Sequence, residues 1–414
     1  MNSQSFLKVG HWPTLLSAFL YFDVSFMVWV MLGPLGPYLS ESLKLNATDK
    51  GFLVAIPLLA GSVFRPLLGA LGDSIGGRKT GILGLCLTLI PLFIAWQFAN
   101  SLQSFYVVGV LLGIAGASFA VALPLASRWY PPEYQGIAMG IAGAGNSGTV
   151  LATLFAPRLA AAYGWHMVFG VAMIAVTLVL CAFFLLAKDS PAPRKPFSFA
   201  AYGELLREPD AAWFSFFYSI TFGGFVGLAS FLTIFAYDQY HLTKVQAGDF
   251  ATVAVVFGSM LRPLGGWLAD KFGGYRILLG VLSGATVCMF FLSTLPVVTL
   301  GLMGVAMVMA MFGIGNGAVF QIIPQRFGPQ VGLITGLVGA AGGIGGFCLP
   351  TLLGYFKSQT GSFSTGLALV ATIIAIGFSA LLLLGPAWLR SWPTEVARRT
   401  GVFSLAKSNP LRTT

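Results

Sequence analysis

Two arginines lie inside long apolar runs of the sequence, at matching places in its two halves. Arg65 falls within the run 51–71 and Arg262 within the run 248–268, and each is followed by Pro, a Gly-rich stretch and Asp. A charged side chain inside a membrane span is costly, and it therefore usually marks a functional site. Arginine keeps its charge, and its planar guanidinium group can hold a planar oxyanion through two parallel hydrogen bonds. The pair predicts a central site for an anion.

Both arginines are predicted to lie deep in the membrane. Asp73 and Asp270 each follow their arginine by eight residues, and eight residues of helix span about 12 Å. If each Asp ends its helix, each guanidinium group falls near the middle of an apolar layer about 30 Å thick. The alternative is a structural arginine that reaches the membrane surface or pairs with an acid, but the spans contain too few acids to neutralise two cations.

Asp23 is the one acid that lies deep in a predicted span. Acids inside membranes often act in proton relays, so Asp23 is a candidate for coupling transport to protons. The alternative is a hydrogen bond or ion pair that packs the first helix. The histidines offer no substitute, because all of them fall at span ends or in loops.

The composition is that of a protein with many membrane spans. Of its 414 residues, 57% are hydrophobic and only 9% are charged, whereas roughly 25% of an average soluble domain is charged. The four cysteines are scattered through apolar segments, and no spacing of Cys, His, Asp or Glu suits a metal or a catalytic centre. We therefore expect no metal, no cofactor and no enzymatic activity.

A helix needs about 20 mostly apolar residues to cross a membrane, and the sequence has twelve such windows. We expect an all-α membrane protein with six helices in residues 1–187, a cytoplasmic linker at 188–211, six helices in 212–387 and a cytoplasmic tail at 388–414. The linker has room for a short interfacial helix at 197–207. The predicted spans are 13–39, 51–71, 80–98, 104–127, 135–160, 164–187, 212–237, 248–268, 275–293, 298–322, 331–355 and 362–387.

The basic residues are distributed unevenly between the two sides of the predicted spans. The chain has a net charge of +10 and 23 Lys and Arg residues, most of them on the side that holds both termini. Cytoplasmic loops carry an excess of Lys and Arg, so this side is predicted to face the cytoplasm of a bacterium. Membrane orientation thus explains the charge, and no nucleic-acid partner is expected. The opposite loops hold Lys44, Lys50, Arg158, Lys244 and Lys357.

A Gly-rich loop motif follows the second span and recurs after the eighth. The copies read GALGDSIGGRK at 69–79 and GGWLADKFGGYR at 265–276, and both resemble the loop motif of the major facilitator superfamily. The resemblance implies two six-helix halves that rock against each other around a substrate held near the membrane midplane. It also implies gating roles for the charged residues of the motif, which are Asp73, Arg78, Asp270 and Arg276.

The fifth and eleventh spans each contain a crowded glycine stretch. They read GIAMGIAGAGNSGTVLATLFAP from Gly136 and GLITGLVGAAGGIGGFCLP from Gly332. Small residues let membrane helices pack closely, but so many glycines also suggest that backbone approaches a small substrate. Together with the paired arginines, these stretches resemble the two signature motifs of the nitrate/nitrite porter family. The resemblance implies substrate contacts at Gly143, Gly145, Asn146, Gly339 and Gly342.

In that family, two arginines hold the anion and aromatic side chains sandwich it. The resemblance extends over residues 16–387 and implies this sandwiching role for Phe119, Tyr218 and Phe222. Tyr218 and Phe222 are four residues apart and so share a helix face. The alternative is ordinary packing, because the chain has 36 Phe residues and aromatic side chains are usually packed in cores. Weaker polar candidates in pore-lining spans are Ser25, Asn316 and Gln321.

Together these features predict a secondary transporter of nitrate, with nitrite as a second cargo, that works by alternating access in the bacterial inner membrane. The first span is more similar to proton-coupled nitrate importers than to nitrate/nitrite exchangers, so import is favoured and exchange is the alternative. An organic-anion facilitator is a further alternative, although such a pore usually needs more Lys or His. A membrane enzyme or sensor would need a catalytic cluster or an output domain. We expect a monomer in the lipid bilayer, with nitrate or nitrite and protons as partners.

Overall fold

The described part of the chain consists of α-helices and one short 3-10 helix. The computed structural model describes residues 9–191, 199–328 and 331–402. These residues contain no β-strand, which confirms the all-α fold. The elements are α2 (Trp12–Trp29), α3 (Gly36–Leu43), α4 (Ala47–Ile75), α5 (Gly77–Gln97), α6 (Leu102–Gly116), α7 (Phe119–Ser127), α8 (Pro132–Gly143), η1 (Ala144–Ser147), α9 (Gly148–Tyr163), α10 (Trp165–Leu186), α11 (Phe199–Leu206), α12 (Pro209–Tyr240), α13 (Lys244–Met260), α14 (Arg262–Phe272), α15 (Gly274–Ser293), α16 (Val298–Phe327), α17 (Val331–Thr360), α18 (Ser364–Ser391) and α19 (Thr394–Arg399).

The described helices make twelve passages along the molecule. Eleven passages, some with a short break, are long and apolar enough to cross a membrane, and α2 followed by α3 makes the other. The span predicted at 13–39 is interrupted by turns at 30–35. The reason is local, because Pro34 and Pro37 lack the backbone N–H that a continuous helix requires there.

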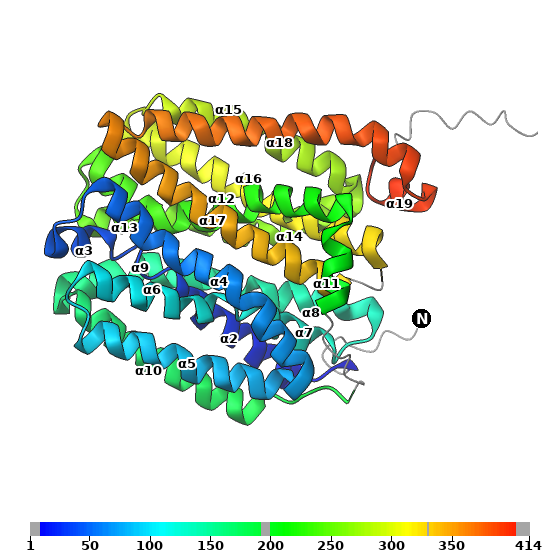
Figure 1. Ribbon diagram of the computed structural model, residues 1–414, viewed down its shortest axis with the longest axis horizontal. Helices are drawn as coiled ribbons and strands as arrows, with labels where there is room; N and C mark the ends of the chain where they lie inside the picture. Colours follow the sequence, from blue (N-terminus) through cyan, green and yellow to red (C-terminus); the bar gives the residue numbers. More distant parts are fainter. Residues whose placement is uncertain (1–8, 192–198, 329–330, 403–414) are drawn as a thin grey trace, which may run out of the picture.

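The two halves lie side by side along the long axis of the molecule. In Figure 1 the helices α2 to α10 form the lower part and α12 to α18 form the upper part. The halves meet where α4 packs on α17 and where α9 packs on α13. The most deeply buried helix is α12, since 94% of its most apolar window lies inside the protein. A helix at this position can present side chains to both halves.

The two Arg-Pro segments of the repeat fold differently. Arg65 lies within α4, which continues past Pro66 to Ile75. In the second half a single turn residue, Leu261, separates α13 from α14 within one membrane-length span, and Arg262 begins α14. A proline removes one backbone N–H and clashes with the carbonyl group one turn earlier, and only the second copy breaks here. Arg65 therefore stands in the middle of a helix and Arg262 at the start of one.

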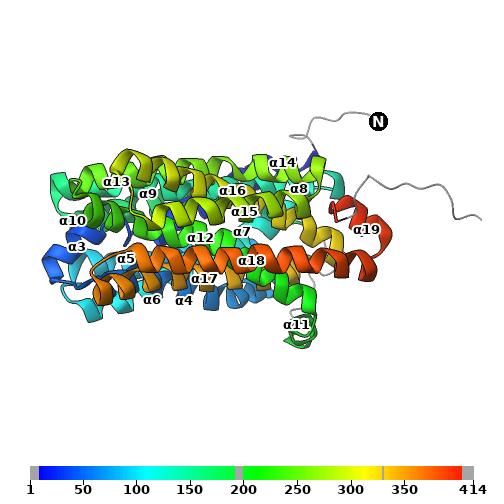
Figure 2. The same cartoon turned by 90° about the horizontal axis from the view of Figure 1, so that it is seen from above.

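The two ends of the molecule carry different elements. α11 and α19 lie at one end and α3 at the other (Figures 1 and 2), and we call these the α19 end and the α3 end. α11 falls within the helix predicted at 197–207, and residues 192–198 of the linker lie outside the described residues. Within the segment predicted as a tail, α19 packs against the second loop motif, because the Tyr275 N–H donates to the Thr400 carbonyl oxygen at 2.9 Å.

Candidate functional site

Arg65 lies at the centre of the molecule inside a group of aromatic rings. Its side chain is 1% exposed. The guanidinium carbon lies 5.1 Å from the ring centroid of Trp29, 5.5 Å from that of Phe119 and 5.2 Å from that of Phe222. The negative face of an aromatic ring attracts a cation, and the attraction grows when water is excluded. The rings thus compensate part of the cost of burying this charge.

Two backbone carbonyl groups also hold Arg65. Its Nε donates to the Gly116 carbonyl oxygen at 3.1 Å, and its Nη1 donates to the Gly339 carbonyl oxygen. Gly116 belongs to the first half and Gly339 to the second, so Arg65 joins the two halves. Its Nη2 has no partner among the described residues. One buried, charged donor therefore remains available for a ligand.

Arg262 is held less firmly than its counterpart. Its guanidinium carbon lies 5.7 Å from the ring centroid of Phe320, and its Nη1 has no partner among the described residues. Arg262 is also near enough to Arg65 for the two positive charges to repel each other. Two like charges repel strongly in surroundings of low dielectric constant. An anion that accepted hydrogen bonds from both groups would relieve that repulsion.

The predicted aromatic residues come together beside the arginines. The rings of Tyr218 and Phe222 are stacked, with centroids 5.0 Å apart and planes 6° apart. Phe320 meets Tyr218 edge to face at 5.0 Å and lies 6.3 Å from Phe119. The Tyr218 hydroxyl is buried and lies close to Arg262, without a hydrogen bond of good geometry to any described residue. Rings from both halves thus line one region that also contains free hydrogen-bond donors.

Gly342 and Gly339 lie on α17 next to this region. A Cβ atom at Gly342 would be 2.8 Å from carbon atoms of both Phe222 and Tyr218, so the stacked rings require glycine there. At Gly339 the nearest atom to a Cβ would be a Phe119 ring carbon at 3.5 Å, an ordinary contact. The glycine stretch of the eleventh span therefore allows close approach to the rings.

The glycine stretch of the fifth span has a different setting. A Cβ atom at Gly145 would lie 2.8 Å from the Asp23 backbone nitrogen, so this glycine packs against α2. A Cβ atom at Gly143 would meet nothing within 4 Å. Asn146 is 1% exposed and lies in η1, and in the amide orientation that satisfies both atoms it donates to the carbonyl oxygens of Ala144 and Gly143. Among these three residues, Gly145 thus serves helix packing and Asn146 stabilises the local turn, whereas Gly143 has open space beside it.

Asp23 faces the same part of the fifth span. The Ser147 hydroxyl donates to Asp23 Oδ1 at 2.7 Å. In the described part of the chain, no ion pair joins Asp23 to either arginine. The arginines are therefore not neutralised by this acid, and the acid is not occupied by a cation.

The predicted gating residues lie at the α19 end, and the contacts of Asp73 and Asp270 stay within one half. Asp73 pairs with Arg128. The backbone N–H of Arg78 donates to the Asp189 carboxylate at 2.9 Å, and its side chain donates to the Phe184 carbonyl oxygen. In the second half, Asp270 lies beside Gln321, and Arg276 is exposed in the first turn of α15. These contacts fasten helix ends within each half.

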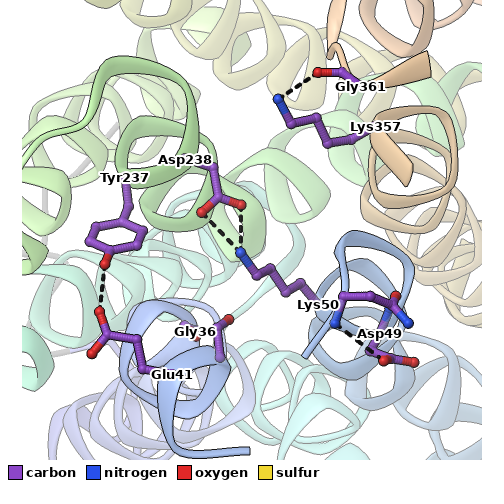
Figure 3. A network of polar contacts seen from close by, with 10 residues as sticks. Gly36, Glu41, Asp49, Lys50, Tyr237, Asp238, Lys357 and Gly361 are labelled. Carbon is purple, nitrogen blue, oxygen red and sulfur yellow. Dashed lines mark hydrogen bonds and ion pairs between the residues drawn. The ribbon is translucent and has the colours of Figure 1, made fainter. Parts of the chain in front are cut away.

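Ion pairs between the two halves lie at the α3 end. Figure 3 shows Lys50 donating to Asp238, at 2.8 Å, and Tyr237 donating to Glu41. Glu41 also pairs with Lys244. A third link joins the halves at the same end, where Arg158 pairs with Asp249 at 2.7 Å.

Backbone contacts close the same end. A Cβ atom at Gly51 of α4 would lie 2.4 Å from the Pro350 carbonyl oxygen, and one at Gly248 of α13 would lie 2.9 Å from that of Thr153. Both contacts cross between the halves, and the two glycines are 197 residues apart, as are the two arginines. The pseudo-symmetric repeat thus brings backbone against backbone at the α3 end.

Two contributors to the site were not predicted. Trp29 faces Arg65 and its Nε1 donates to the Pro57 carbonyl oxygen at 2.6 Å, and Phe320 covers Arg262. The sequence offered little to single them out, because aromatic residues make up 14% of the chain. A weak signal was spacing, since Phe320 follows the predicted candidate Asn316 by one helical turn.

Comparison with known proteins gives consistent results. A model of the Major Facilitator Superfamily matches residues 17–350. The "Nitrite extrusion protein" of Bacillus subtilis (strain 168) is 33% identical over 381 residues, which cover 91% of this chain and 94% of the relative. The "Probable nitrate transporter NarT" of Staphylococcus carnosus is 33% identical, covering 81% and 87%. The "Probable nitrate/nitrite antiporter NarK1" of Thermus thermophilus is 31% identical, covering 87% and 88%.

Solved structures share the fold. A bacterial homolog to the human lysosomal transporter Spinster, in an inward-facing and occupied conformation, superposes with a TM-score of 0.69. It is 18% identical, and the match covers 91% of this chain and 97% of that one. The human organic anion transporter MFSD10 gives a TM-score of 0.71 at 14% identity, covering 89% and 99%. At these identities the likeness concerns the architecture alone.

Proposed function

Because the chain belongs to the Major Facilitator Superfamily and, within it, to the nitrate/nitrite transporters, we propose that it carries nitrate bound between Arg65 and Arg262. Transport of nitrate or nitrite by a multi-pass membrane protein is common to its relatives. Nitrate as the preferred cargo, and the two arginines as its ligands, are our proposal.

The observation that carries this proposal is the pair of free guanidinium nitrogens, Arg65 Nη2 beside the buried ring of Phe222 and Arg262 Nη1 beside the half-buried ring of Phe320. Buried donors nearly always have hydrogen-bond partners, so free ones imply a ligand. Nitrate is flat, carries one negative charge and accepts hydrogen bonds through three oxygens. Flat rings beside a guanidinium fork suit that shape. A round anion such as chloride would lose the two-point contact.

The proposed transport cycle opens the two ends of the molecule in turn. The excess of basic residues at the α19 end favours a cytoplasmic position for that end and for both termini. The ion pairs between the halves at the α3 end then represent a closed external gate. An anion between the arginines lowers their repulsion and so favours the conformation in which both halves contact it.

For coupling, we propose that Asp23 carries a proton together with the anion. The carboxyl group binds Ser147 and no cation among the described residues, so a proton is free to bind and leave without breaking an ion pair. Intramembrane acids of this kind mark proton relays in many transporters. Exchange of nitrate for nitrite is the second candidate, because one relative is named as an antiporter.

Nitrate uptake into proteoliposomes tests the function and the coupling together. One arm has an inward proton gradient, and the other has internal nitrite without a gradient. We expect uptake in the first arm, loss of it in Asp23→Asn, and its retention with an altered pH dependence in Ser147→Ala, which keeps the carboxyl group. Uptake only against internal nitrite would make the protein an exchanger. Absence of uptake in both arms would contradict nitrate transport and favour an organic anion.

A further inference from the structure

Asn316 is a buried polar residue of α16 that none of the contacts described above explains. Its side chain is 0% exposed, and neither Nδ2 nor Oδ1 has a partner among the described residues. An amide buried without hydrogen bonds is costly, and native proteins rarely keep one. An unsatisfied amide at the centre of a transporter therefore points to a ligand that the amide binds.

The packing of α16 places Asn316 beside the start of α14. A Cβ atom at Gly313 would lie 2.2 Å from the Gly258 carbonyl oxygen, and one at Gly317 would lie 2.5 Å from the Arg262 carbonyl oxygen. From the first contact to the second, both helices advance by four residues in the same direction. The two helices therefore run parallel, with Gly313 beside Gly258 and Gly317 beside Arg262. Asn316 precedes Gly317 directly and thus lies at the level of Leu261 and Arg262.

Asn316 also shares a helix face with Phe320, the residue one turn later. The Phe320 ring lies 5.7 Å from the Arg262 guanidinium carbon and 5.0 Å from the Tyr218 ring. Side chains on a helix lean toward its N-terminus, so those of Asn316 and Arg262 lean in the same direction. The amide is thus directed to the region of the Arg262 guanidinium group.

Other free polar atoms surround the same region. Ser259 precedes Arg262 by about one turn, is 2% exposed and has an unpartnered hydroxyl. The Tyr218 hydroxyl and Arg262 Nη1 are unpartnered as well. Together with Asn316 Nδ2, these groups place several buried hydrogen-bond donors in the region of Arg262.

We propose that Asn316 is a specificity-determining residue of the anion site, which rests on the function proposed above. Its Nδ2 donates to one oxygen of the planar oxyanion that Arg262 also binds. A neutral amide adds a donor without adding charge. A site built to donate to several oxygens discriminates against ligands that leave its buried donors unpaired. Asn316 therefore favours nitrate over chloride and over nitrite, which has fewer oxygens.

The test compares Asn316→Leu with Thr233→Val in the purified, full-length protein. Both substitutions replace a fully buried, unpartnered polar side chain by an apolar one of similar size. Thr233 lies fifteen residues after Tyr218 on α12, about 22 Å along the helix, and serves as the matched control. The measurements are the rise in unfolding temperature with added sodium nitrate, sodium nitrite or sodium chloride, and the KM and kcat of nitrate uptake into proteoliposomes.

We expect Asn316→Leu to raise the nitrate KM roughly 10- to 100-fold, the range for a lost hydrogen bond to a charged partner. We expect its preference for nitrate over nitrite to shrink and Thr233→Val to keep wild-type values. Asn316→Asp should lose stabilisation by nitrate altogether, because the added negative charge competes with the anion for Arg262. If Asn316→Leu fails to fold, Asn316→Ala removes the amide without adding volume.

Two outcomes separate this inference from the proposed function. A folded Asn316→Leu or Asn316→Ala protein with wild-type KM and selectivity would overturn the role of Asn316 while leaving nitrate transport intact. A wild-type protein that is neither stabilised by nitrate nor able to take it up would refute the proposed function, and the role of Asn316 with it. A rise in KM in both Asn316→Leu and Thr233→Val would also count against Asn316, because it would reflect general packing.

Discussion

Arg65 and Arg262 occupy equivalent places in the repeat, yet the protein holds them very differently. Arg65 lies within a continuous helix, touches three aromatic rings and binds a carbonyl oxygen from each half. Arg262 begins a helix, touches one ring and has a free Nη1. The protein therefore holds Arg65 through more contacts than Arg262.

The charges at the centre also contrast with those at the α3 end. Two cations oppose each other at the centre, whereas cations and anions face each other across the halves at the α3 end. The protein is thus held together by ion pairs at the α3 end, while the two cations repel each other between the halves. In the proposed function, an anion between the arginines would change that balance and so couple binding to rearrangement.

The largest expected effect comes from replacing either arginine by lysine. Arg65→Lys and Arg262→Lys should each lower kcat/KM for nitrate by about 100-fold or more, because truncating a buried, hydrogen-bonded ion pair costs about 2–5 kcal/mol. Only Arg65→Lys should also lower the unfolding temperature without nitrate, since it loses the bond from Nε to Gly116. Equal losses of stability in both variants would show that the two sites are held alike.

Replacing one aromatic ring beside each arginine tests the difference between the two arginine sites. Trp29→Phe keeps an aromatic ring but loses the hydrogen bond from Nε1 to the Pro57 carbonyl oxygen, so it should lower the free energy of unfolding by about 0.5–1.5 kcal/mol. Phe320→Leu should leave stability nearly unchanged and raise the nitrate KM several-fold, by about 0.5–2 kcal/mol of lost cation–π attraction. Chemical unfolding and uptake kinetics measure the two effects, and the reverse pattern would contradict the comparison.

The stacked rings of Tyr218 and Phe222 allow a smaller, steric test. Gly342→Ala puts a Cβ atom 2.8 Å from carbons of Tyr218 and Phe222, and displacing the rings should cost about 1–3 kcal/mol and reduce nitrate uptake about tenfold. The control is Gly140→Ala, whose Cβ atom would meet nothing within 4 Å. Wild-type uptake in Gly342→Ala would mean that the rings can move freely.

The smallest effect concerns pH at the α3 end. Hydrogen bonds from Lys244 and then Tyr237 lower the pKa of Glu41 below its usual 4.5. A lowered carboxyl pKa contributes stability that is present above the unfolded pKa and is lost as pH falls through the folded pKa. Unfolding temperature measured below about pH 4.5 should therefore fall slightly more in the wild type than in Glu41→Gln. The effect should be small because surface ion pairs contribute little to stability. If the unfolding temperatures of the two proteins depend on pH in the same way, the backbone contacts hold the α3 end closed.

Most of the architecture could be predicted from the sequence. Low charge and twelve apolar windows predicted the all-α membrane fold, which the helices and the family match confirm. The repeat predicted that Arg65 and Arg262 lie at equivalent depths, because equal spacing along helices gives equal rises. The resemblance in the glycine stretches predicted the nitrate/nitrite family, which the relatives confirm.

Side-chain partners required the tertiary structure. The sequence repeats Arg-Pro, yet only the second copy breaks its helix. It gave no reason to expect the bond from Arg65 to Gly339, 274 residues away, or Phe320 over Arg262. Composition and spacing determine which faces of a helix are apolar. The neighbours of a side chain depend on how the helices of the two halves are oriented and packed against each other. That packing is decided only when the whole chain folds.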